Sequence, residues 1–91
     1  MEKKDIYIKD LTEENNRLFA MNDSIKQRRK DMKKELLHIC DGYGSEEDIK
    51  KSAQLIGRLL GLAYLYRLNL KYIKTNLEVI RGLRNGTKQE I

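Results

Sequence analysis

Apolar side chains recur every seven residues through the first half of the chain. One line of this repeat is apolar at five successive positions: Leu11, Leu18, Ile25, Met32 and Ile39. The companion line is polar in its middle: Ile8, Asn15, Asn22, Arg29 and Leu36. Taken as heptad positions d and a, the two lines predict a helix with a coiled-coil seam. Polar a residues weaken such a seam but fix its register and partner number; the alternative is that this side of the helix is exposed.

The first helix is predicted over about residues 8–40. Two local signals leave its course open. Thr12 followed by two acids has the pattern of an N-cap, and Ser24 with Gln27 three residues later has the pattern of a capping box. A break near residue 23 would give a three-helix bundle. The heptads continue through Asn22 without a skip, which favours one continuous helix.

A turn is predicted over residues 41–45, because Gly42 and Gly44 permit the positive φ angles of a helix end and a turn. Ser45 then has the place of an N-cap, followed by acids that favour the positive end of a new helix. The second helix is expected over about residues 46–83, with a short tail at 84–91. The chain is therefore expected to be one helical domain, 1–91, built as a long two-helix hairpin.

Apolar residues cover two sides of the second helix. One broad face is predicted to pack on the first helix: Ile49, Ala53, Ile56, Leu59, Leu60, Ala63, Tyr66, Leu70, Ile73, Leu77 and Ile80. A second stripe is predicted to be an oligomer interface: Gly57, Gly61, Tyr64, Leu65, Leu68, Tyr72 and Val79. A single hairpin cannot cover both sides, and two glycines one turn apart allow another backbone to approach closely. We therefore expect a homodimer that forms a four-helix bundle.

The composition limits how the chain can be stabilised and in which compartment we expect it. The chain has 91 residues, one cysteine and no proline, so no disulfide forms within it and long helices are permitted. A chain this small buries little surface on its own, and a second subunit is a common remedy. Its first residues lack the apolar run of a signal peptide, and its most apolar stretch is too short and too charged for a membrane span. We expect a soluble, cytoplasmic protein.

The net charge of +5 is unevenly distributed, because the segment from Lys50 to Lys88 contains nine basic residues and one acidic residue, Glu78. The candidate binding face is basic: Lys26, Arg29, Lys30, Lys33, Lys34, Arg67, Lys71 and Lys74. Such a face suits an acidic protein surface or, through charge neutralisation, a nucleic-acid backbone. The alternative is that this basic face is only solvated and binds no partner.

The sequence contains few candidate catalytic residues. His38 and Cys40 have no evident arrangement of partners for nucleophilic catalysis, and one His with one Cys cannot make a structural zinc site. We expect no catalytic residues, no metal, no cofactor and no small-molecule substrate.

The leading hypothesis is a small non-enzymatic regulatory protein that binds a partner protein through its basic faces, such as a phage or mobile-element inhibitor of a host enzyme. The first alternative is a nucleic-acid-binding dimer without sequence specificity. The second is a small helical enzyme of chorismate-mutase-like architecture, although the arginine, lysine and acid positions do not line up with that architecture.

Overall fold

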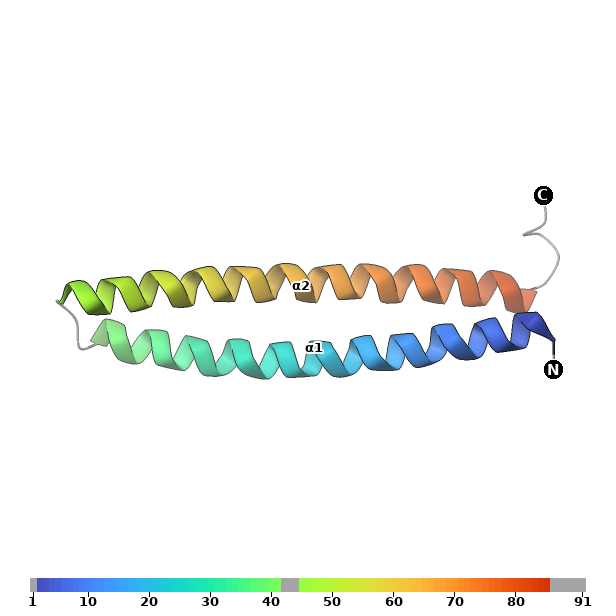
Figure 1. Ribbon diagram of the computed structural model, residues 1–91, viewed down its shortest axis with the longest axis horizontal. Coiled ribbons are helices and arrows are strands. Elements are labelled where there is room, and N and C mark those ends of the chain that lie inside the picture. Colours follow the sequence, from blue (N-terminus) through green and yellow to red (C-terminus); the bar gives the residue numbers. More distant parts are fainter. Residues whose placement is uncertain (1, 42–44, 86–91) are drawn as a thin grey trace.

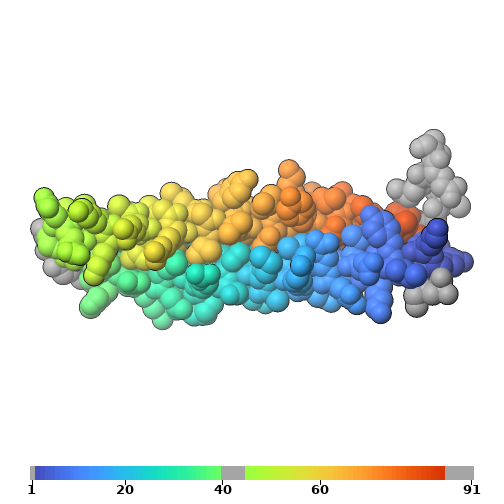
Figure 2. Space-filling view, viewed as in Figure 1, coloured from blue at the N-terminus to red at the C-terminus, as the bar shows by residue number. Residues whose placement is uncertain are grey.

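The protein is an extended hairpin of two antiparallel helices (Figure 1). The computed structural model describes residues 2–41, with residues 40 and 41 as backbone only, and residues 45–85. Helix α1 spans Lys3–Asp41 and helix α2 spans Glu46–Asn85. The molecule measures 64 × 23 × 14 Å, and the two helices stay in contact along its length (Figure 2). The predicted all-α hairpin is confirmed.

Helix α1 is continuous, so the predicted alternative of a break near residue 23 is not realised. It also begins at Lys3, earlier than expected. The two candidate caps are used differently: the Thr12 hydroxyl donates to the Ile8 carbonyl at 2.8 Å, and the Gln27 amide donates to Asp31 at 3.1 Å. Both bonds join residues four apart within one helix, so neither cap ends or begins a helix.

Helix α2 begins as the sequence predicts. The Ser45 hydroxyl accepts a hydrogen bond from the backbone N–H of Asp48 at 3.1 Å, the bond that an N-cap serine makes. The helix continues to Asn85, slightly beyond its expected end. The predicted turn glycines at 42 and 44, and the tail from 86 to 91, lie outside the described residues.

The heptad lines of α1 form its contact with α2. All ten members of the a and d lines are buried or half-buried, from Ile8 to Ile39. The most deeply buried apolar ones are Leu18 and Ile25. The predicted seam is therefore confirmed, including its polar members, because Asn15 and Asn22 are buried rather than exposed.

The face of α2 that contacts α1 differs from the predicted one. Ten of its buried or half-buried residues follow heptads of their own: Ser52, Leu55, Leu59, Leu62, Tyr66, Asn69, Ile73, Asn76, Ile80 and Leu83. The predicted face shares Leu59, Tyr66, Ile73 and Ile80 with this seam. Its other large members are exposed: Ile49, Ile56, Leu60, Leu70 and Leu77. The prediction was wrong there because apolar residues surround most of α2, so hydrophobicity alone does not select one side.

Two equivalent asparagine layers set the register of the hairpin. The side-chain amide of Asn69 donates to the side-chain oxygen of Asn22 at 2.9 Å, and Asn22 donates to the Tyr66 carbonyl at 3.4 Å. One heptad away, Asn76 donates to Asn15 at 2.9 Å, and Asn15 donates to the backbone carbonyl of α2 three residues before Asn76, also at 3.4 Å. Both layers require the same alignment of α1 against α2.

Candidate interaction surfaces

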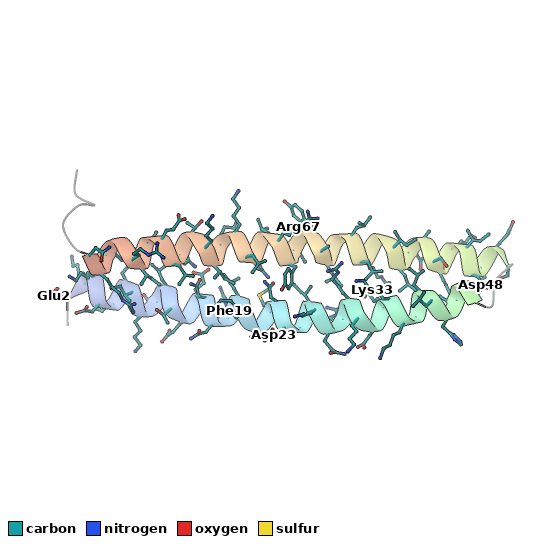
Figure 3. All side chains as sticks on the ribbon, turned by 180° about the vertical axis from the view of Figure 1, so that it is seen from behind. Glu2, Phe19, Asp23, Lys33, Asp48 and Arg67 are labelled. Carbon is teal, nitrogen blue, oxygen red and sulfur yellow. The ribbon has the colours of Figure 1, made fainter. Side chains whose placement is uncertain are left out.

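The hairpin has two flanks, one on each side of the seam. We assign Ser52, Leu59 and the residues that follow them at seven-residue steps to heptad position a of α2. In an antiparallel pair the e positions of both helices then lie on one side of the seam and the g positions on the other. We call the e side the basic flank and define it by five cations: Lys26, Lys30 and Lys33 of α1, and Arg67 and Lys74 of α2. Figure 3 labels Lys33 and Arg67 on their respective helices.

The g side is the apolar flank, defined by Tyr7 and Met21 of α1 and by Leu65, Tyr72 and Val79 of α2. Four of these side chains are exposed large apolar groups, with Leu65 at 44% and Tyr72 at 53% relative exposure. Val79 is half-buried. Sequence reasoning found the α2 members of this flank but missed Tyr7 and Met21, whose signal was their position directly before the seam residues Ile8 and Asn22.

A basic hollow lies where the basic flank meets the seam. Lys26, Arg29, Lys30 and Lys33 of α1 line it together with Tyr66 of α2, around a volume of about 430 Å³. The four cations follow the helix at three- and four-residue steps, so they share one face of α1. Four of the eight basic residues predicted from the sequence therefore come together at one site, next to an aromatic ring from the other helix.

Arg29 is the most constrained member of the basic hollow. It occupies an a position one heptad after Asn22, and the register of the asparagine layers sets it opposite Leu62. Its side chain is half-buried. Its Nε is buried and finds no hydrogen-bond partner among the residues that the structure describes. Leaving such a donor unpaired costs about 1–3 kcal/mol, so this guanidinium is an unmet donor at the edge of the hollow.

No cation of the basic hollow forms an ion pair with the side chains that the structure describes. Among those side chains the one ion pair joins Arg17 to Glu14 at 3.6 Å, outside the hollow and highly exposed. The positive charges of Lys26, Lys30 and Lys33 are therefore open to an external anion.

The remaining predicted basic residues are dispersed. Arg67 and Lys71 line a separate shallow hollow of about 320 Å³ with Tyr64 and Leu68 of the same helix. Lys34 and Lys74 are exposed and line neither hollow. The predicted basic face is thus two sites: the one on α1 draws on both helices, and the one on α2 lies on that helix alone.

The predicted oligomer stripe is exposed except for Leu68 and Val79, which are half-buried. Gly57 and Tyr64 occupy f positions, which point directly away from α1, whereas Gly61 and Leu68 border the apolar flank at c positions. A Cβ atom built at Gly57 or at Gly61 would meet nothing within 4 Å. The hairpin therefore gives no packing reason for either glycine.

Gly61 instead helps to open an apolar notch of about 510 Å³. The notch is lined by Met32, Gly61, Leu62 and Leu65, with Arg28 and Arg58 at its rim. It shares no lining residue with the basic hollow. The two depressions therefore belong to different sides of the seam.

An apolar strip runs along α2 on the side of the basic flank. It consists of the e positions: Ile49, Ile56, Ala63, Leu70 and Leu77. Ile49 and Leu77 have relative exposures of 66% and 48%. These residues were predicted to contact α1, and the structure instead leaves them as a second row beside the seam.

Within the described residues there is no group of three or more His, Cys, Asp or Glu side chains that could hold a metal ion. His38 is exposed in the last turn of α1, and the Cys40 side chain lies outside the described part. No helix in the described part has an apolar stretch long enough to span a membrane. Comparison of the chain with protein-family models, with curated proteins and with solved structures finds no match.

Proposed function

We propose that the protein is a small non-enzymatic interaction protein, which pairs with a second copy of itself and binds an acidic partner protein. The observation that carries the proposal is the exposed apolar surface of α2. Large apolar side chains on both sides of its seam remain uncovered by α1. Contiguous exposed apolar surface of this kind marks an interaction site on a protein. A helix with apolar residues on several sides is typical of the interior of a larger bundle.

Charge indicates which flank receives the second copy. From Lys50 to Asn85 helix α2 carries one acid, Glu78. Two basic flanks placed face to face would therefore bring cations together with little to neutralise them. The apolar flank has no such conflict around Tyr72 and Val79, and a two-fold axis lets the same patch serve both subunits.

The mass in solution tests this assembly. At micromolar concentration, sedimentation equilibrium should give about twice the chain mass of 10.7 kDa. Leu65→Glu should raise the dissociation constant at least ~100-fold, because pairing would bury a charge without a partner. Leu60→Glu is the matched control: the same change on the same helix, but on the other side of the seam, where Leu60 is 67% exposed.

Leu60→Glu should leave the dimer intact. If the unmodified protein has the mass of one chain, the pairing proposal is wrong. If Leu60→Glu dissociates the dimer and Leu65→Glu does not, the apolar flank is wrong as the interface.

A further inference from the structure

We infer that the basic hollow receives a carboxylate from an acidic amphipathic helix of the partner protein, and that Arg29 holds it. This inference rests on the proposed function, since it specifies what the basic flank binds and through which residue. The basis is a juxtaposition: an arginine half-buried in the seam, three exposed lysines and a parallel apolar strip all lie on one flank of the rod.

Arg29 supplies the specific contact. Arg29 lines the hollow, and the two terminal nitrogens of a guanidinium donate parallel hydrogen bonds to a carboxylate with fixed planar geometry. Its Nε is buried, so an external carboxylate would bind at the terminal nitrogens. Because Arg29 is half-buried in the seam, its position is fixed by packing before any ligand arrives.

The surrounding cations extend the contact along one helical face. Lys26 lies one turn before Lys30, and Lys33 lies one turn after Arg29 and two turns after Lys26. Acids spaced one turn apart on a partner helix would meet these lysines in succession. The lysines add long-range attraction, while the guanidinium adds orientation.

The apolar strip favours a protein helix over a nucleic acid. Ile56, Ala63 and Leu70 recur at seven-residue steps beside the basic hollow, and seven residues is the repeat of a packed helix. A third helix in this groove could place apolar residues on the strip and acids against α1. A phosphate backbone has no apolar groups to pack on the strip. In the sequence, Asp23 precedes the cations of the hollow and Asp31 lies between Lys30 and Lys33, so the row of cations is interrupted.

A second copy of the chain does not meet these requirements. Beyond its first turn α2 has the single acid Glu78 as far as Asn85. The part of α1 that is richest in acids, from Asp10 to Glu14, has no matching apolar row, because its apolar heptads are already buried against α2. The occupant is therefore a different protein.

A synthetic helix tests the site with the full chain. The probe is a labelled peptide of about four heptads, with Leu in the core positions and Glu beside them. A second peptide has Gln in place of every Glu. Fluorescence anisotropy at fixed salt should show the Glu peptide binding at least ~10-fold more tightly than the Gln peptide, because charge-assisted bonds are stronger than neutral ones.

Matched variants then locate the contact. Arg29→Met should weaken binding of the Glu peptide at least ~10-fold, while its thermal unfolding midpoint by circular dichroism stays the same or rises, because the unpaired donor is gone. Lys34→Met removes the same charge outside the hollow and should change the affinity less than ~2-fold, as for a screened surface charge. Lys33→Met, an exposed lining residue, should weaken binding several-fold and serves if Arg29→Met fails to fold.

Equal binding of the two peptides would overturn the inference, and so would equal losses in Arg29→Met and Lys34→Met. A labelled oligonucleotide that binds more tightly than the Glu peptide, and depends on Arg29, would overturn the choice of a protein helix. Sedimentation of the same samples separates the two proposals. A dimer that binds neither peptide refutes the carboxylate site but not the homodimer. A single-chain species that binds the Glu peptide through Arg29 refutes the homodimer but not the carboxylate site.

Discussion

Four asparagines determine how the two helices align, and they do so through hydrogen bonds rather than through apolar contact. Each α1 asparagine accepts from an asparagine of α2 and donates to a backbone carbonyl of α2. A buried amide needs such partners, since an unpaired one costs about 1–3 kcal/mol. An apolar layer would tolerate a shift of one heptad, whereas these layers do not. Their role in fixing the register was one of two readings of the sequence, and their burial and bonding favour it.

Replacing one asparagine should cost more than replacing two. Asn69→Leu leaves the Asn22 oxygen buried without its donor and should lower the free energy of unfolding by about 1–3 kcal/mol. Asn22→Leu combined with Asn69→Leu makes an apolar layer and should recover most or all of that loss. Urea denaturation measures each value, and Asn16→Leu, at an exposed position, should stay within about 0.5 kcal/mol.

The Asn15–Asn76 layer remains in the double variant and requires the same alignment, so sedimentation of the double variant should give the same mass as the unmodified protein. Strictly additive losses in the two single variants and the double variant would mean that Asn22 and Asn69 are not coupled.

At the scale of the elements, the face of α1 that contacts the other helix was predictable and the corresponding face of α2 was not. The two lines through Leu18 and Asn22 are the one regular pattern in α1, and they form the seam. In α2 apolar residues lie on the seam, the apolar strip and the apolar flank. Apolar periodicity alone therefore does not decide which of these faces packs on α1. The residues that distinguish the true seam are Asn69 and Asn76, which a search for apolar periodicity discards. Pairing them with Asn22 and Asn15 at the same spacing was the available signal.

The two mid-helix glycines of α2 give an element-scale prediction. Gly57→Ala and Gly61→Ala should each stabilise the hairpin by about 0.5–1 kcal/mol, because alanine favours helix and its Cβ meets open space at both positions. In the proposed dimer Gly61 borders the interface and Gly57 faces away from α1. Gly61→Ala should therefore raise the dimer dissociation constant, and Gly57→Ala should not.

Thermal melts at concentrations below and above dimerisation separate the two effects. A Gly61→Ala protein that gains stability equally at both concentrations would show that no second backbone approaches Gly61.

At the scale of the whole molecule, the rod distributes different chemistry over its two long sides. The sequence indicated both an apolar stripe and a basic face but could not place them relative to each other, because that requires the seam as a reference. With the seam known, Leu65 and Tyr72 lie on one side, and Lys26 and Lys33 on the other. The sequence did not distinguish Arg29 from the other basic residues, because its unpaired Nε results from packing against α2 and not from its spacing along the chain.

The asparagine layers also bear on how the chain reaches this shape. Their partners are 47 and 61 residues apart in sequence, and closing loops directly at such separations is costlier than extending a hairpin from its turn. Growth from the turn reaches the Asn22 layer before the Asn15 layer. In a hairpin that is one heptad out of step, either Asn22 meets Asn76 or Asn15 meets Asn69, and the other two asparagines lose their asparagine partners. Only the native alignment pairs all four, so we expect the two layers together to disfavour misaligned hairpins as they extend from the turn.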